Sequence, residues 1–188
     1  KRPRGNPPGV QIPPSPRDVV DDACSMTLAG YVLLGVIDIV VIAGLSVLIG
    51  ATAPRWPETW LGRDTWLTKP RGWETPNFYR RIGAAWLAAR LPELGALFGG
   101  RSKREVPGRD LASLEQYLVE VRRAIWVHSL SMLTWLPLLA FNPWWLSLAG
   151  AVIAIGINIP FLVILRGNNI RLSRMVKALR AREQESGR

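Results

Sequence analysis

Cysteine and histidine are almost absent from this chain of 188 residues, which contains one of each, Cys24 and His128. A single cysteine excludes an intrachain disulfide. Zinc sites of the usual kind combine several cysteine and histidine ligands, so we expect no metal site. Acidic residues are also fewer than basic ones. The chain contains 14 Asp and Glu and 24 Lys and Arg, which gives a formal net charge of +10.

This excess of basic charge has two common explanations, binding to nucleic acid and contact with an anionic membrane surface. The chain also contains long apolar runs separated by charged segments, and a nucleic-acid-binding domain has no need of them. Nine tryptophans are present, and tryptophan is enriched at membrane–water interfaces. We therefore expect an integral membrane protein with membrane lipids as partners and no nucleic acid.

The apolar runs are long enough to predict membrane-crossing helices. We expect an all-α integral membrane protein with about three transmembrane helices and additional interfacial amphipathic helices. The predicted segments are a disordered Pro/Arg-rich arm at 1–25, a first transmembrane helix at 26–52, a basic interfacial segment at 53–123, a transmembrane helical hairpin at 124–166 and a basic C-terminal helix at 167–188.

Basic segments flank the predicted hairpin, whose spans cover about 124–141 and 144–165 with a turn between them. Cytoplasmic loops of membrane proteins carry an excess of Lys and Arg. We therefore expect a multi-pass protein of the cell membrane, with residues 53–124 and the C-terminus in the cytoplasm.

Three local features add detail to this arrangement. Residues 82–100 are apolar but interrupted, and we interpret them as an interfacial helix, a turn and a second short amphipathic piece. Asp110 is the predicted N-cap of a helix over 110–124. Asp38 lies inside the first span, where a carboxylate is costly, so it either has a functional role or forms a hydrogen bond with a neighbouring helix.

The only histidine lies close to the start of the second predicted span. Imidazole has an unperturbed pKa near neutrality, so His128 is a candidate general base; the alternative is an interfacial histidine that bonds to a neighbour. Glu120 precedes it by eight residues on one helix, so the two could line one cavity but not touch. Arg123 is one turn from Glu120 and could pair with it.

Polar and basic residues also mark the end of the third predicted span. Asn158 and Pro160 lie inside the span, where both disfavour a regular helix. Arg166, Arg171 and Arg174 follow where the helix leaves the membrane. Arginine binds phosphate well, but the same pattern also arises from simple anchoring of a helix end.

A further cluster precedes the apolar segment at 82–100. Trp73, Glu74 and Tyr79 lie between basic residues. A glutamate in this setting is a candidate catalytic or substrate-binding acid.

These clusters, in this order, resemble the glycosyl-4,4′-diaponeurosporenoate acyltransferases, small membrane enzymes of carotenoid synthesis. The resemblance covers about residues 56–175. Four motifs carry it: Trp73-Glu74 with Phe78-Tyr79; Leu91-Pro92-Glu93 with Gly95 and a following basic stretch; Glu120 with Arg123 and His128; and Asn158 and Pro160 with Arg166, Asn168, Asn169 and Arg171. The chain departs from the family pattern at polar or aromatic positions, at Ala88, Ala89, Arg90, Ile125, Gly167 and Asn169.

The resemblance implies transfer of a fatty acyl chain from an acyl thioester, acyl-CoA or acyl carrier protein, to a sugar hydroxyl. The acceptor would be a glycolipid or a glycosylated carotenoid, and no other cofactor is implied. The catalytic residues would be His128, Glu120 and Glu74. Substrate-binding residues would be Arg123, Asn158, Arg166, Asn168, Asn169, Arg171, Tyr79 and Trp73.

Asn158 is further expected to stabilise the tetrahedral oxyanion of the reaction. An alternative remains open, because Ile125, Gly167 and Asn169 replace residues that the family usually carries. The chain would then be a non-catalytic accessory subunit of a larger membrane protein complex. A channel or transporter is a weaker third interpretation, because three spans are few.

Overall fold

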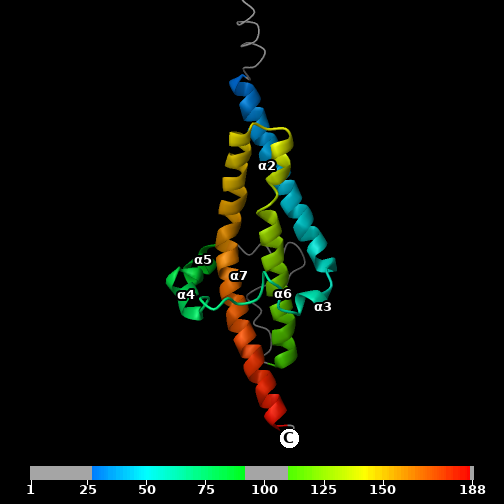
Figure 1. Cartoon of the computed structure of the whole chain (residues 1–188), viewed down its shortest axis with the longest axis vertical. Coiled ribbons are helices and arrows are strands. Elements are labelled where there is room, and N and C mark those ends of the chain that lie inside the picture. Colours follow the sequence, from blue (N-terminus) through cyan, green and yellow to red (C-terminus); the bar gives the residue numbers. More distant parts are fainter. Residues whose placement is uncertain (1–26, 92–109, 187–188) are drawn as a thin grey trace, which may run out of the picture. The chain divides into compact units, whose positions relative to one another are not determined.

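The structure, a computed structural model, describes residues 27–91 and 110–186 (Figure 1). Its described part consists of α-helices, short 3-10 helices and turns, and contains no β-strand. This confirms the predicted all-α class. The chain divides into two units, residues 1–36 and 37–188, and the described part of the first is the beginning of helix α2. The predicted arm at 1–25 lies outside the described residues.

Two helices, α2 (Leu28–Thr52) and α7 (Trp144–Ser186), are long and apolar enough to cross a membrane. Their most apolar windows have mean hydropathies of 2.8 and 2.5, and only 11% and 33% of these windows is buried. Exposed apolar side chains therefore cover both helices, among them Val47 on α2 and Val152 and Ile157 on α7. Apolar surface of this extent is typical of contact with lipid.

The second predicted span is not a single helix. Helix α6 (Leu111–Ser131) ends inside it, and after a turn the chain forms a short 3-10 helix, η3 (Leu136–Ala140). The hydroxyl of Thr134 donates to the carbonyl of Ser131 at 2.8 Å, and Pro137 has no N–H with which to continue a helical ladder. The count of three spans is therefore not confirmed.

Helices α6 and α7 lie side by side and antiparallel (Figure 1). Residues near the start of α6 meet the end of α7, as in the exposed ion pair of Glu115 with Arg180. Asp110 caps α6 as predicted, since its side chain accepts from the N–H of Ser113 at 2.9 Å. The shared core consists of apolar residues at helical spacing, namely Leu114, Leu118, Val121, Ile125, Leu165, Leu172 and Val176.

Short helices follow α2 in the described residues up to 91. They are η1 (Ala53–Arg55), α3 (Glu58–Leu61), α4 (Pro76–Arg81) and α5 (Ala84–Arg90). Helix α3 packs against α6, whereas α4 and α5 pack against α7. The predicted interfacial helix in 82–100 corresponds to α5, and residues 92–100 lie outside the described residues.

Asp38 is buried in α2, with 4% of its surface exposed. Its carboxylate accepts a hydrogen bond of 2.6 Å from Nδ2 of Asn142, so its partner lies in the turn that precedes α7. Nearby, Ile42 packs with Leu138 of η3. Gly150 permits this packing, because a Cβ there would lie 2.6 Å from the Leu138 side chain.

Candidate active site

The only histidine pairs with the asparagine of the apolar part of α7. Nδ1 of His128 lies 2.7 Å from Oδ1 of Asn158. Nδ2 of Asn158 donates to the carbonyl of Ala154 at 2.8 Å, which fixes the orientation of the amide, because its oxygen could not face that carbonyl. Nδ1 therefore carries a proton in this contact, and in a neutral ring the lone pair that a general base needs is then on Nε2.

The helix around Asn158 is adapted to hold this pair. Pro160 lies two residues further along and supplies no N–H to the ladder of α7. Phe161, one helical turn after Asn158, stacks on the imidazole of His128 with ring centroids 4.8 Å apart and an interplanar angle of 6°. A hydrogen bond and a stacked ring thus fix the His128 ring in position.

A second group of candidates meets where the segment before α4 reaches α7. Glu74 is 4% exposed. Its Oε1 accepts from the hydroxyl of Tyr79 at 2.6 Å and from Nε of Arg166 at 2.9 Å. Its Oε2 accepts from the backbone N–H of Arg71 at 2.7 Å and from Nη2 of Arg166. The carboxylate of Glu74 is therefore fully engaged within the protein.

These contacts fix the protonation states of the group. Burial would raise the pKa of Glu74, but hydrogen bonds from Arg166, Tyr79 and the backbone of Arg71 outweigh it and lower that pKa below 4.5. Burial and the bond to Glu74 raise the pKa of Tyr79 to about 12. Glu74 thus stays ionised and Tyr79 neutral near pH 7, which suits a structural contact better than proton transfer.

Glu120 and Arg123 form the predicted pair on α6. Nη1 of Arg123 donates to Oε1 of Glu120, and Nη2 lies 3.9 Å from a carboxylate oxygen of Glu58 in α3. Glu120 precedes His128 by eight residues, a rise of about 12 Å along the helix. As predicted, this spacing does not allow the two side chains to touch directly.

Sequence reasoning missed Arg122, which is 4% exposed. Its Nη1 donates to the carbonyls of Leu61 at 3.3 Å and Gly62 at 2.6 Å, and its Nη2 pairs with Asp64. A signal was present, because residue 122 follows Leu118 by four and falls on the apolar stripe of α6. A charged residue on such a stripe must find partners inside the fold.

Comparison with protein families found a match that covers this region of the chain. The family model of glycosyl-4,4′-diaponeurosporenoate acyltransferase matches residues 58–178, well over half of the chain. The chain belongs to this acyltransferase family. The searches of curated proteins and of solved structures found no match. The matched range contains the His128 pair, the Glu74 group and Arg122.

Three of the chain's departures from the pattern of this acyltransferase family have structural roles. Ile125 is completely buried in the core between α6 and α7. Gly167 lies against Tyr79, and a Cβ at Gly167 would approach the Tyr79 side chain to 3.2 Å. Asn169 is also completely buried; its Nδ2 donates to the carbonyl of Thr68 at 2.7 Å, and its Oδ1 accepts from Arg122 at 3.4 Å. These replacements are accommodated by packing and hydrogen bonds.

Other predicted site residues of this acyltransferase family member lie at the surface. Trp73 is 57% exposed and makes an edge contact with Phe78. Arg171 is exposed, and Asn168 is partly exposed. The structure therefore brings His128 together with Asn158, and Glu74 together with Tyr79 and Arg166, as two separate groups. Asn158 and Arg166 are eight residues apart on α7, a rise of about 12 Å.

Proposed function

We propose that this protein is a membrane O-acyltransferase that moves a fatty acyl chain from an acyl thioester to a sugar hydroxyl. The acceptor is a glycolipid or a glycosylated carotenoid. Membership of the family supports the reaction class. The observation that carries the proposal is the 2.7 Å contact between His128 and Asn158, which orients the imidazole within an apolar helix pair.

The chemistry follows from the assigned tautomer. Nε2 of His128 takes the proton of the sugar hydroxyl while the hydroxyl oxygen attacks the carbonyl carbon of the thioester. The tetrahedral intermediate collapses, the carbon–sulfur bond breaks, and the thiolate leaves with the proton from the imidazolium. The products are a sugar ester and a free thiol, so atoms and charge balance without a further reactant.

Asn158 is assigned a positioning role in this scheme. Both ends of its amide are directed within the protein, toward His128 and toward Ala154. This geometry supports orientation of the base better than the expected stabilisation of the oxyanion. Asn158 therefore does for His128 what a hydrogen-bonded carboxylate does in a catalytic triad.

Of the remaining candidate residues, some hold the fold together and others are proposed to bind the substrate. Glu74 and Arg166 hold the segment before α4 against α7. Glu120, partly exposed beside Arg123, is proposed to bind hydroxyl groups of the sugar. Trp73, Arg171 and Asn168 are surface groups available to an amphiphilic substrate.

The proposed site suits substrates that enter from a bilayer. We propose that α7 crosses the cell membrane with residues 53–124 and the C-terminus on the cytoplasmic side. The His128 pair then lies about 12 Å deeper than Arg166 along α7. At that depth an acyl chain can lie in the lipid, while the donor reaches the site from the cytoplasm.

The alternative of a non-catalytic subunit rested on Ile125, Gly167 and Asn169. Each of these residues has a packing or hydrogen-bonding role in the fold. No described contact favours the subunit over the enzyme.

Substitution of His128 tests the proposal. Membranes that contain the His128→Ala variant should transfer acyl groups from a thioester to a glycosylated lipid about 10²–10⁴-fold more slowly than wild type, because the general base is lost. Asn158→Ala should lower the turnover number more than it raises the KM, since Asn158 positions the base. Glu115→Ala, in an exposed ion pair, is the control and should retain activity. Near-normal turnover of His128→Ala would remove His128 as the base.

A further inference from the structure

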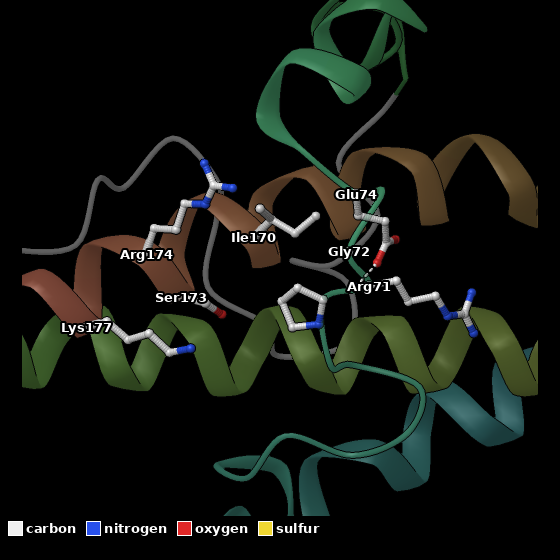
Figure 2. Close-up of a pocket in the computed structure, with 8 residues that line it drawn as sticks. Arg71, Gly72, Glu74, Ile170, Ser173, Arg174 and Lys177 are labelled. Carbon is white, nitrogen blue, oxygen red and sulfur yellow. Dashed lines mark hydrogen bonds between the residues drawn. The ribbon is translucent and has the colours of Figure 1, made fainter.

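A pocket of about 250 Å³ lies between the segment that precedes α4 and the C-terminal part of α7 (Figure 2). It is separate from the His128 pair. Its lining combines small, apolar and cationic residues with one carboxylate, namely Pro70, Arg71, Gly72, Glu74, Ile170, Ser173, Arg174 and Lys177.

The charge of this pocket is positive. Arg71, Arg174 and Lys177 contribute three cations, and none of them forms an ion pair within the described ranges 27–91 and 110–186. The single carboxylate, that of Glu74, is already bound by Arg166. The pocket therefore attracts anions, whereas Arg122, Arg123 and Arg166 are paired with carboxylates of the chain itself.

A buried hydroxyl in the same pocket has no partner. Ser173 is 7% exposed, and its Oγ forms no hydrogen bond within the described part of the chain. A serine in a helix can donate to the carbonyl four residues earlier, but this one does not. A buried polar group without a partner is unfavourable, so the Ser173 hydroxyl is suited to a ligand that accepts a hydrogen bond.

The side chains can surround such a ligand. Figure 2 shows the amino group of Lys177 and the hydroxyl of Ser173 on the same side of α7. The guanidinium groups of Arg71 and Arg174 point away from these two groups in Figure 2. Both arginines are exposed, so their long side chains are free to turn toward an anion held by Ser173 and Lys177.

We propose that this pocket binds the phosphate ester of the acyl-thioester donor, an inference that rests on the proposed acyl transfer. Phosphate matches the site because it offers negatively charged acceptor oxygens, which cationic and hydroxyl groups bind well. Arg166 is not available for this role, since Glu74 and the carbonyls of Leu67 and Lys69 already accept its hydrogen bonds.

The distance between the pocket and the base supports the donor as the source of the phosphate. Ser173 follows Asn158 by fifteen residues, a rise of about 22 Å along α7. In coenzyme A and in acyl carrier proteins a long flexible arm separates the phosphate from the thioester. A donor held by its phosphate at Ser173 and Lys177 can therefore extend its thioester toward His128.

Binding of 4′-phosphopantetheine tests this assignment. The full chain is placed in phosphatidylcholine nanodiscs and titrated calorimetrically with 4′-phosphopantetheine or with pantetheine, which differ only in the phosphate. Wild type should bind the phosphorylated compound at least about tenfold more tightly, the effect of one charge-assisted contact. Lys177→Gln and Ser173→Ala should remove most of that difference, whereas Arg182→Gln, an exposed cation further along α7, should not.

Two results would overturn the assignment. One is equal affinity of wild type for the two compounds. The other is loss of binding to phosphatidylglycerol vesicles by Lys177→Gln with unchanged binding of 4′-phosphopantetheine, which would assign the pocket to a lipid headgroup. His128→Ala should bind 4′-phosphopantetheine as wild type does, so a failure of acyl transfer and a failure of phosphate binding can be told apart.

Discussion

At the scale of single residues, the buried ion pair of Glu74 and Arg166 should affect the free energy of unfolding most. The two side chains are 2% and 12% exposed, and Tyr79 and the backbone of Arg71 complete the hydrogen bonds of the carboxylate. Desolvation of two charges offsets much of their attraction, so the pair adds little net stability. Its loss is nevertheless costly, because the remaining charge would be buried without a partner.

Glu74→Gln should therefore lower the free energy of unfolding by about 3–5 kcal/mol. Denaturant titration of the protein in mild detergent measures this change. The matched control is Glu115→Gln, which breaks the exposed pair with Arg180 and should cost about 1 kcal/mol or less. Equal effects of the two substitutions would show that burial of the Glu74 pair has no energetic consequence.

Glu74 and its neighbour Tyr79 make the free energy of unfolding depend on pH. The pKa of Glu74 is lowered on folding, so its contribution is present above pH 4.5 and is lost as the pH falls through the lower folded value. The pKa of Tyr79 is raised from 10.0 to about 12. Its contribution is therefore present below pH 10 and is lost as the pH rises toward 12. Glu74→Gln should remove the acidic part of this profile.

Some residue pairs could be predicted from the sequence and others could not. Glu120 and Arg123 lie one turn apart on one helix, so spacing alone predicts their contact. His128 and Asn158 were both identified as candidates, but their pairing depends on the antiparallel register of α6 and α7. Arg122 was missed because its partners, Gly62 and Asp64 among them, lie about sixty residues away.

At the scale of elements, the segment at 61–74 is attached to the helix pair mainly through side chains that bind its backbone. Arg122 binds the carbonyls of Leu61 and Gly62, Asn169 binds that of Thr68, and Arg166 binds those of Leu67 and Lys69. The segment contains only one short helix end and turns. Its position relative to α6 and α7 therefore depends on these polar contacts.

Asn169→Ala should loosen this segment without unfolding the helices. Loss of the buried bond to Thr68 leaves a carbonyl unsatisfied, a cost of about 1–3 kcal/mol. Hydrogen–deuterium exchange of the N–H groups of Thr68 and Lys69, which bond to Thr65, should accelerate by about tenfold or more. Asn168→Ala, the neighbouring substitution at a partly exposed side chain, should leave the exchange unchanged. Equal exchange in the two variants would contradict the role of Asn169.

The elements differed in how far the sequence could predict them. Long apolar runs predicted α2 and the first half of α7, whereas the predicted C-terminal helix at 167–188 is the continuation of α7 to Ser186. The Asp110 cap with its apolar spacing predicted the start of α6. The end of α6 at Ser131 was not predicted, although Pro137 within the apolar run was a signal. The attachment of the segment at 61–74 could not be predicted, because it depends on three side chains brought together by the fold.

At the scale of the whole molecule, we propose that α7 crosses the membrane and that the turn before α7 lies on the outer side. In a Cys24→Ser background, single cysteines at Arg63 and Gln184 should react with a membrane-impermeant maleimide only in inside-out vesicles. A cysteine at Phe141, which is 48% exposed beside the turn, should react only in intact cells. Labelling of all three positions from one side would show that α7 and its preceding turn do not cross the bilayer.

The proposed reaction is tested most directly by lipid mass spectrometry of cells that lack this protein. We predict that cells that lack this protein lose an acylated glycosyl lipid and accumulate its unacylated precursor. Wild-type protein should restore the product, and His128→Ala, present in the membrane at the same level, should not. An unchanged lipid profile after deletion, or full restoration by His128→Ala, would contradict the account.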